Sequence, residues 1–502
     1  MAAPGVDARG TRRRAEPRKR RSAEGVVHLT AEYWPLARTG GLGEAVNGLA
    51  TFQAESGTPT AVVMPLYRMV RDKAPALERV GPSFTVSLGS RLEEGWLYRV
   101  PGDSGPRVYL IEHPDYFDRA AIYGDGADYP DNARRFAFFS LAAVAALPQI
   151  APEARVLHAH DWHTALATVF LRTRYADRPF YRDLATVVSV HNAGFQGHYP
   201  PETMVDLGLP MELFDWRVFE WYGRMNVLKG GLAFADAAVT VSPTHADELR
   251  TAEGGFGLHE VFVGMGERLS GVLNGIDADK WDPDRDPNLP AHFSSSDLAG
   301  KRKCKTALQH AYGLPEDPNV PLFAMSARLV SQKGLDLVLG GDLLHRSDAQ
   351  FIFLGAGERR YHDLLAAHAD RFPDHVAVEF AFTDHLEHGL LGGADLLLMP
   401  SLYEPCGLTQ MRAQRYGAIP VARRVGGLKD SIEDGRTGFL FTEYTPEALD
   451  AGVERALAAY RAKSTWRAMV KRAMELPFGW GGAAERYREV YRMALATRAG
   501  AT

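Results

Sequence analysis

Short apolar runs rich in β-branched residues alternate along this chain with longer stretches in which apolar residues recur at helical spacing. Six runs in the first half are predicted to be strands: residues 26–30, 61–64, 107–111, 156–160, 185–191 and 237–242. Five more follow in the second half: residues 322–326, 351–354, 376–380, 395–399 and 419–422. This alternation is typical of βαβ units, so the sequence predicts an α/β protein built on parallel sheets.

The two series of strands are separated by a polar stretch rich in Pro and Asp, residues 277–292. Clusters of these residue types favour loops, so the stretch is predicted to be a linker. Each flanking series spans about 200 to 250 residues, which is a normal size for one doubly wound domain. Ligands of such domains bind beyond the carboxyl ends of the strands, so we expect a site in the cleft between the two domains.

Composition narrows the classes of function. The 502 residues are 46% hydrophobic and 24% charged, as in ordinary globular proteins, and no apolar run is long enough to cross a membrane. The net charge of −5 gives no indication of nucleic-acid binding. Two cysteines, Cys304 and Cys406, are too few for a disulfide framework or a zinc cluster and fit a reducing compartment, so a cytoplasmic protein is expected.

The first 22 residues differ from the rest of the chain. They include eight basic and two acidic residues, a net charge of +6, and almost no large apolar residues. Such a block cannot bury an apolar face, so residues 1–22 are predicted to be a basic disordered arm. The arm lacks the apolar segment of a secretory signal, and a passive extension is favoured over a polyanion-binding or targeting role.

A glycine-rich loop follows the first predicted strand and precedes a stretch with helical periodicity. Gly40 and Gly41 would let backbone N–H groups approach a phosphate, and Arg38 supplies a fork of donors that suits phosphate oxygens. A plain tight turn between strand and helix would give the same glycine pattern. The loop is therefore compatible with a phosphate site or with a turn alone.

Histidines end the fourth predicted strand, in the run His158-Ala-His160-Asp-Trp-His163. Such side chains at a strand end are well placed to bind the hydroxyl groups of a polar ligand. A metal site on the three histidines is the less favoured interpretation, because the run lacks the helical His-Glu-x-x-His spacing of a zincin. A buried core role for His158 fits its apolar neighbours.

Charged residues follow two predicted strands of the second half. Arg328 and Lys333 lie where a strand ends and a helix begins, so their charges could stabilise a diphosphate leaving group. Glu404 lies in a similar strand-to-helix turn, where it could face a ligand or cap the helix. A solvated pair of cations on a rim is the structural alternative for Arg328 and Lys333.

Seven motifs, in this order, closely resemble those of bacterial glycogen synthases and plant starch synthases: Arg-Thr-Gly-Gly-Leu-Gly, His-Ala-His-Asp-Trp, His-Asn-x-x-Phe-Gln-Gly, Val-Ser-Pro-x-x-Ala-x-Glu, Leu-Asn-Gly-Ile-Asp, Arg-x-x-x-Gln-Lys-Gly and Glu-Pro-Cys-Gly-Leu-Thr-Gln. The resemblance runs from about Val26 to about Tyr491. It implies a GT-B fold, in which two Rossmann-like domains face each other across a cleft. It also implies retaining transfer of glucose from ADP-glucose to the non-reducing end of an α-1,4-glucan, without a metal or other cofactor.

The resemblance further implies a division of the chain and of its site. Residues 23–276 would form the domain on the glucan acceptor side, residues 277–478 the domain on the nucleotide-sugar side, and residues 479–502 a helix that crosses back to the first domain. The implied catalytic residues are His160, Arg328, Lys333 and Glu404. The implied substrate-binding residues are Arg38, Gly40, Gly41, Asp131, Asn192, Asn274, Phe382, Cys406, Gly407, Leu408 and Thr409.

Several positions depart from the usual pattern of the family. Arg38 replaces a lysine, Glu44 an aspartate, and three aromatic positions carry Phe195, His245 and Phe382 in place of tyrosine. Arginine keeps the charge but changes reach and geometry, and phenylalanine keeps a stacking face but loses a hydroxyl. Two alternatives therefore stay open: a transferase for another nucleotide sugar and a catalytically silent glucan-binding protein.

Overall fold

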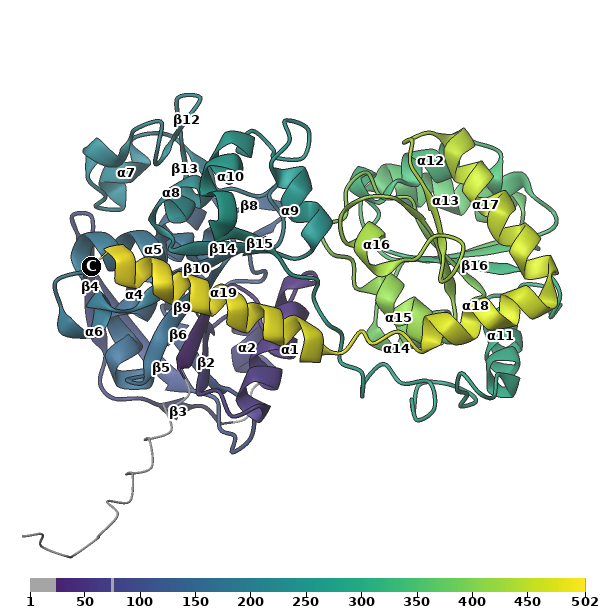
Figure 1. The fold of residues 1–502 in the computed structure, drawn as a ribbon, viewed down its shortest axis with the longest axis horizontal. Helices are drawn as coiled ribbons and strands as arrows, with labels where there is room; N and C mark the ends of the chain where they lie inside the picture. Colours follow the sequence, from purple (N-terminus) through teal and green to yellow (C-terminus); the bar gives the residue numbers. More distant parts are fainter. Residues whose placement is uncertain (1–23, 74–75, 502) are drawn as a thin grey trace, which may run out of the picture.

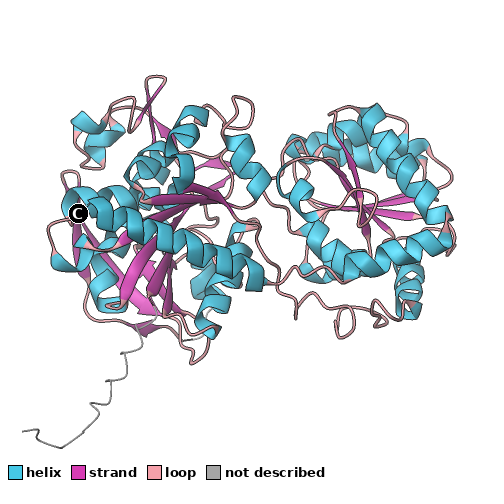
Figure 2. Cartoon of the chain, in the orientation of Figure 1, coloured by secondary structure: helices cyan, strands magenta, loops and turns pink. Residues whose placement is uncertain are grey.

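The computed structural model describes residues 24–73 and 76–501, so the predicted basic arm lies outside the described residues. Figure 1 shows two domains, each built around its own sheet, and Figure 2 shows helices on both sides of these sheets. No helix in the described ranges combines the length and the apolar character that a membrane span requires.

The first domain contains a ten-stranded sheet with the order β15-β14-β10-β9-β1-β2-β6-β5-β3, in which β4 pairs with β5. The strands are β1 (Gly25–Leu29), β2 (Thr60–Pro65), β3 (Glu78–Arg79), β4 (Phe84–Leu88), β5 (Arg91–Arg99), β6 (Arg107–Glu112), β9 (Ala154–His160), β10 (Ala185–Val190), β14 (Ala237–Thr240) and β15 (Leu269–Gly271). From β15 to β6 the pairs are parallel, and β5 is antiparallel to its neighbours β6, β3 and β4. The central strands β1, β2 and β10 are buried along their whole length, because helices cover both faces of the sheet.

Helices of the first domain fill the connections between these strands. They are α1 (Leu42–Glu55), α2 (Arg68–Lys73), α3 (Pro114–Phe117), α4 (Asn132–Ile150), α5 (Trp162–Arg174), α6 (Pro179–Arg182), α7 (Thr203–Asp206), α8 (Val227–Phe234), α9 (Pro243–Leu249) and α10 (His259–Met265). Two small antiparallel units stand beside the main sheet: β7 (Gly124–Asp125) with β8 (Ala127–Asp128), and β11 (His198–Tyr199) with β12 (Glu220–Trp221) and β13 (Arg224–Asn226).

The second domain contains a six-stranded, fully parallel sheet with the order β18-β17-β16-β19-β20-β21. Its strands are β16 (Leu322–Ser326), β17 (Gln350–Leu354), β18 (Val376–Glu379), β19 (Leu396–Met399), β20 (Ile419–Arg423) and β21 (Phe439–Phe441). Its helices are α11 (Ala299–Ala311), α12 (Leu335–Gly340), α13 (Arg359–Arg371), α14 (Asp384–Gly393), α15 (Thr409–Arg415), α16 (Gly426–Ser431), α17 (Pro446–Arg461) and α18 (Lys463–Met474).

The last helix, α19 (Trp480–Ala501), leaves the second domain and lies along the sheet of the first (Figure 1). It packs against α1, β10 and β14 through buried side chains that include Trp480, Tyr487 and Tyr491. The end of the chain therefore covers the face of the first sheet that α4 and α5 do not cover.

The eleven predicted strands all occur, with ends shifted by no more than two residues. The sequence did not predict β3, β4 and β5, although β4 alternates apolar and polar residues, nor the short edge strands β15 and β21. Residues 277–292, predicted to be a linker, run between the two domains as a loop. The stretch has no helix or strand, but Trp281 stacks on His388 at 3.8 Å and the Asp286 carboxylate lies 2.6 Å from the same histidine, so it is fixed to the second domain.

Candidate active site

The predicted site residues lie mainly in the loops that follow β1, β9, β10, β16, β18 and β19, where the two domains meet. Contacts between the domains join these loops directly. Ser242 Oγ donates a hydrogen bond to the Pro405 carbonyl at 2.6 Å, and a Cβ placed on Gly41 would lie 3.7 Å from a methyl group of Leu408. The loops from separate halves of the sequence therefore form one site at the domain interface.

The turn after β19 holds a buried carboxylate. Glu404 is 6% exposed, and one of its oxygens lies 2.6 Å from Lys333 Nζ and 3.0 Å from Ser401 Oγ. Lys333 comes from the short turn between β16 and α12. Gly427 donates to the Glu404 carbonyl, and a Cβ at Gly427 would lie 2.0 Å from the Cys406 carbonyl, so only glycine allows this close approach.

Arg328 is exposed, and its charge acts on Tyr403, the residue before Glu404. Burial raises the pKa of Tyr403 above its usual value, and a hydrogen bond with Asn192 and the charge of Arg328 act in the opposite direction. A Cβ at Gly194 would lie 3.3 Å from the Tyr403 hydroxyl. Asn192 of the first domain is thus brought to the Tyr403–Glu404 turn of the second. The Arg328–Lys333–Glu404 group carries two positive charges and one negative charge.

The next residues of the turn lie against the first domain. Cys406 is buried, which raises the pKa of its thiol to about 12 and keeps it neutral, while hydrogen bonds from Asn274 act in the opposite direction. Gly407 has a φ of 68°, a conformation that glycine adopts without strain. Leu408 and Thr409 then begin α15, where Thr409 Oγ1 lies 3.4 Å from Glu387. The structure therefore brings Asn274, Cys406, Gly407 and Leu408 together.

Arg38 is engaged by protein carboxylates in this structure. It pairs with Glu44 on its own domain and with Asp384 on the other, and Glu44 also pairs with Arg412. Burial alone would raise the pKa of Asp384, but hydrogen bonds from Lys280 and Arg38 hold it at about 2. We call these residues the latch: Arg38, Glu44, Lys280, Asp384 and Arg412. A diphosphate that binds Arg38 has to compete with two carboxylates.

His160 is buried among other histidines. It is 1% exposed, and its ring nitrogens lie 3.0 Å from His28 Nδ1 and 2.9 Å from His191 Nε2. The histidine of this group that is partly exposed is His191, which follows β10. His160 is thus in the loop region of the site, but its side chain is enclosed by two other histidines, and its predicted contact with the sugar stays a prediction.

The three nearest histidines, His28, His158 and His160, have ligand atoms within 4.8 Å of one another. Each of their six ring nitrogens already has a hydrogen-bonding partner: another histidine, Gln53, Ser189 or Tyr491. Burial lowers the pKa of all three, that of His28 to about 4. These observations fit a neutral hydrogen-bonded chain better than a metal centre.

Two further predicted residues lie apart from the Lys333–Glu404 pair. Asp131 precedes α4 and forms a bidentate ion pair with Arg119, at 2.6 and 2.7 Å. Phe382 lies in the loop between β18 and α14 and is 45% exposed, so its ring is available for stacking. The latch residue Asp384 lies two positions further along the chain and pairs with Arg38, which places the Phe382 loop near Arg38.

Sequence reasoning missed the residues that position these loops. Glu32, 3% exposed, accepts hydrogen bonds from Thr39 and from the Gly40 N–H, so it fixes the glycine-rich loop. Thr244 pairs with Asp430 at 2.6 Å, and Glu248 accepts from the Gly426 N–H at 2.8 Å. The Val-Ser-Pro-x-x-Ala-x-Glu motif therefore joins the domains. The only sequence signal for Glu32 was its position, since this carboxylate lies two residues after the first predicted strand and shortly before the glycine-rich loop.

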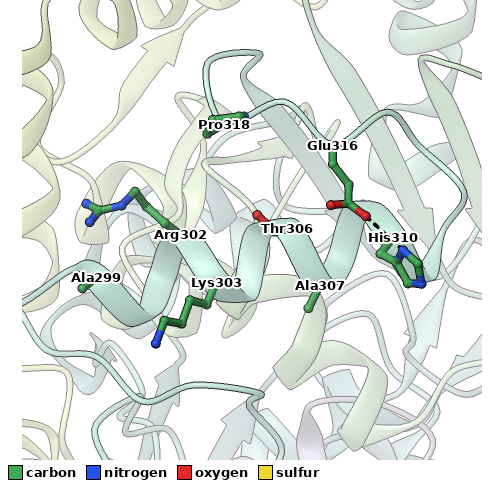
Figure 3. A pocket seen from close by; sticks show the side chains of 8 residues that line it. All are labelled: Ala299, Arg302, Lys303, Thr306, Ala307, His310, Glu316 and Pro318. Atoms are coloured by element: carbon green, nitrogen blue, oxygen red, sulfur yellow. Dashed lines mark hydrogen bonds and ion pairs between the residues drawn. The ribbon is translucent and has the colours of Figure 1, made fainter.

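A hollow on the second domain is unrelated to this site. Figure 3 shows it along α11, lined by side chains that include Arg302, Lys303 and His310, with His310 paired to Glu316 at 2.9 Å. None of its lining residues is a predicted site residue. The hollow is therefore separate from the candidate site at the domain interface.

Two Rossmann-like domains with cations and a carboxylate at their facing strand ends define a nucleotide-sugar glycosyltransferase of the GT-B class. The model of the starch synthase catalytic domain matches residues 25–263, and that of glycosyl transferases group 1 matches residues 308–473. The chain belongs to the glycogen synthase and starch synthase family, and it is a glucosyltransferase of the kind this family comprises.

Individual relatives support this assignment over nearly the whole chain. A glycogen synthase of Anaeromyxobacter dehalogenans is 42% identical, covering 93% of this chain and 99% of that protein. Glycogen synthase 2 of Geobacter sulfurreducens is 40% identical over 95% of this chain and 100% of its own. The catalytic domain of starch synthase IV from Arabidopsis thaliana, solved with ADP and acarbose, is 33% identical with a TM-score of 0.87, covering 95% of this chain and all of that domain. A sucrose-phosphate synthase at 16% identity and a TM-score of 0.60 shares the fold.

Proposed function

We propose that this protein transfers glucose from ADP-glucose to the non-reducing end of an α-1,4-glucan with retention of configuration. The observation that carries the proposal is the Lys333–Glu404 pair, 2.6 Å apart, together with the exposed Arg328 at the domain interface. The printed ligands of the starch synthase IV domain, ADP and acarbose, fit a nucleotide donor and a glucan-like acceptor. A reducing compartment such as the cytoplasm agrees with the two free cysteines.

The chemistry that we infer uses protein charges only, without a metal or other cofactor. The bond between the glucose C1 and the diphosphate oxygen breaks through an oxocarbenium-like transition state, and negative charge grows on the leaving diphosphate. Arg328 and Lys333 stabilise that charge, because they are fixed in place before the reaction begins. The diphosphate oxygen takes the proton of the acceptor hydroxyl as the new bond to C1 forms on the same face.

Glu404 is better suited to hold Lys333 and the sugar than to act as a nucleophile. Lys333 and Ser401 both donate to the same carboxylate oxygen, Oε2, and this ion pair and hydrogen bond stabilise the carboxylate charge and so make it a weaker nucleophile. Hydroxyl groups of the transferred glucose can donate to the other oxygen of Glu404 and accept from the N–H groups of the turn from Gly407 to Thr409. The predicted roles of Arg38, Gly40, Gly41 and Phe382 at the nucleotide end belong to the same proposal.

Incubation with ADP-glucose and maltotriose tests the proposal. We expect release of ADP together with longer maltooligosaccharides whose new linkages are α-1,4 by proton NMR. Absence of transfer to maltotriose and to glycogen would support the catalytically silent alternative. Transfer only from another nucleotide sugar would support the alternative donor that Arg38 and Phe382 leave open.

A further inference from the structure

Hydrogen bonds connect three histidines in a row that leads from the interior of the first domain to the site. His28 Nδ1 lies 3.0 Å from His160 Nε2, and His160 Nδ1 lies 2.9 Å from His191 Nε2. At the inner end, His28 Nε2 lies 2.8 Å from Oε1 of Gln53, a buried residue of α1. We call these four residues the histidine row: Gln53, His28, His160 and His191. The row joins a helix that covers the sheet to the loop after β10.

The oxygen of Gln53 determines where each ring in the row carries its proton. A neutral imidazole has one proton, so one ring nitrogen donates and the other accepts. An amide oxygen can only accept, so His28 donates from Nε2 and accepts at Nδ1. His160 must then donate from Nε2 and accept at Nδ1, and His191 must donate from Nε2. Burial lowers the pKa of all three histidines, which keeps the rings neutral. One amide group therefore fixes the protons of three rings.

The orientation of this amide is held by the last helix. Gln53 Nε2 donates to the Tyr491 hydroxyl at 3.1 Å, and that hydroxyl lies 3.0 Å from Nδ1 of His158. The other ring nitrogen of His158 lies 2.7 Å from Ser189 Oγ. Because α1 and α19 pack side by side, this contact belongs to the packing of the two helices (Figure 1). The reverse orientation of the amide would move the proton from Nε2 to Nδ1 in every ring of the row.

The outer end of the row leaves one ring nitrogen available to a ligand. His191 is half-buried, and within the described ranges its Nδ1 is accessible and has no hydrogen-bonding partner. The backbone N–H of His191 donates to Asp161 Oδ1 at 2.7 Å, and Asp161 has a φ of 58°, a strained conformation that persists mainly at functional sites. The next residue, Asn192, contacts Tyr403 of the second domain. The free nitrogen therefore lies on the loop that reaches the Tyr403–Glu404 turn.

We propose that Gln53 is a positioning residue for sugar binding: it holds Nδ1 of His191 unprotonated, so that this nitrogen accepts a hydrogen bond from a hydroxyl group of the transferred glucose. The identity of the sugar in this inference rests on the proposed function. An unprotonated nitrogen binds a hydroxyl group, which can donate, but not an ionised phosphate oxygen, which can only accept. With the reverse proton position, His191 would donate to a phosphate oxygen instead. Gln53 thus determines which part of a nucleotide sugar can bind at the end of β10.

The proton positions can be measured on the full chain without any substrate. Long-range proton–nitrogen correlation spectra of protein with isotope-labelled histidine distinguish the protonated ring nitrogen from the unprotonated one. We expect the proton on Nε2 in His28, His160 and His191, each signal being assigned by its loss in a single-substitution variant. Gln53→Leu should move part of the proton population to Nδ1. Gln309→Leu, which changes a buried glutamine of the second domain, is the matched control and should leave these signals unchanged. A proton on Nδ1 of His191 in the wild type would overturn the proposal, whether or not the protein transfers glucose.

Calorimetric binding of ADP-glucose without acceptor tests the contact with the sugar. His191→Phe keeps a flat ring but removes the acceptor, so Kd should rise on the order of threefold to tenfold. Gln53→Leu should raise Kd in the same direction, and Gln309→Leu should not. One monodeoxy analogue of ADP-glucose should bind the wild type and His191→Phe equally, because it lacks the hydroxyl group that binds Nδ1.

The outcomes separate this proposal from the proposed function. An equal loss of affinity in His191→Phe for ADP-glucose and for every monodeoxy analogue would overturn the contact with the sugar, even if the protein transfers glucose. The expected binding pattern without any glucosyl transfer would contradict the proposed function and leave the roles of Gln53 and His191 supported. A protein that does not bind ADP-glucose would contradict both.

Discussion

The strand ends of the two domains carry polar side chains of opposite character. At the ends of β1, β9 and β10, four histidines are bound to one another and to buried polar groups: His28, His158, His160 and His191. At the ends of β16 and β19, charged side chains are in place and Arg328 is exposed. In the first group, every ring nitrogen of His28, His158 and His160 has a partner within the protein and only His191 is partly exposed, whereas the second group retains charge that a ligand can use.

This difference shows that the neighbours on adjacent strands determine whether a polar residue at a strand end is satisfied within the protein or available to a ligand. His158 lies beside His28 in the pairing of β9 with β1, so three neighbouring strands fill the same region with imidazoles. Tyr491 of α19 and Gln53 of α1 complete the chain of hydrogen bonds. We therefore expect the histidine group to govern stability and the charged group to govern the rate of transfer.

The largest expected effect is on the rate. Lys333→Gln keeps length and hydrogen-bonding capacity but removes the charge, so kcat should fall on the order of a hundredfold or more. Nucleotide affinity should fall less, because the additional charge on the diphosphate appears only as the glycosidic bond breaks. Steady-state kinetics with ADP titration checks both, with the exposed Lys303→Gln as control. Near-normal turnover of a folded Lys333→Gln protein would remove Lys333 from the mechanism.

The histidine group predicts a pH dependence of stability. Burial lowers the pKa of His191 to about 3 and that of His28 to about 4, whereas both titrate near 6.5 when unfolded. Between pH 4 and 6.5 the unfolded chain binds more protons, so the free energy of unfolding should fall as pH falls, by roughly 2 kcal/mol for each histidine from pH 7 to pH 5. Urea unfolding at pH 7, 6 and 5 measures this. A free energy of unfolding that does not change over this pH range would contradict a neutral, buried histidine group. His310→Gln changes an exposed histidine and is the control, which should show the same pH dependence as the wild type.

Removal of one hydroxyl tests the contact with the last helix. Tyr491→Phe leaves the amide of Gln53 and Nδ1 of His158 without a partner, which should cost about 1–3 kcal/mol of unfolding free energy. The accompanying change in kcat should be much smaller than that of Lys333→Gln. Urea unfolding and turnover are compared with those of Tyr312→Phe, a partly exposed tyrosine of the second domain. A large loss of kcat with an unchanged free energy of unfolding would contradict the structural role of this hydroxyl and indicate a role in catalysis.

The smallest effect concerns the latch. Asp384→Asn removes one of the two carboxylates that hold Arg38, so Arg38 should bind the donor diphosphate more readily and KM for the donor should fall by about twofold to fivefold. Asp279→Asn changes an exposed ion pair and should have no effect. A higher KM for the donor in Asp384→Asn would show instead that Asp384 itself binds the nucleotide sugar.

The sequence was sufficient for all the parallel strands except the edge strands β15 and β21, and for the loops that carry the predicted site. Runs such as those at β16 and β19 are continuously apolar and are followed by Arg328 or Glu404, so both strand and function have a local signal. His160 lacked such a signal, because its surroundings are set by β1 and β10, which are distant in sequence. The same holds for Arg38, whose partner Asp384 is 346 positions away in the chain.

The hairpin formed by β12 and β13 shows a different limit of the sequence-based prediction. Tyr222-Gly223 is a recognisable turn, but the sequence alone does not reveal that Trp221 is hydrogen-bonded to Gly257 or that Phe256 contacts Tyr403 of the other domain. Contacts between domains depend on their relative position, which no local pattern encodes.

The most direct test of the account is a comparison of donors with the wild-type protein and glycogen as acceptor. We predict incorporation of glucose into glycogen from ADP-glucose, with kcat/KM for ADP-glucose well above that for UDP-glucose and GDP-glucose. A higher kcat/KM for either of the other donors would contradict the proposed donor. Failure of all three donors, with a folded protein, would contradict the assignment of a working glucosyltransferase.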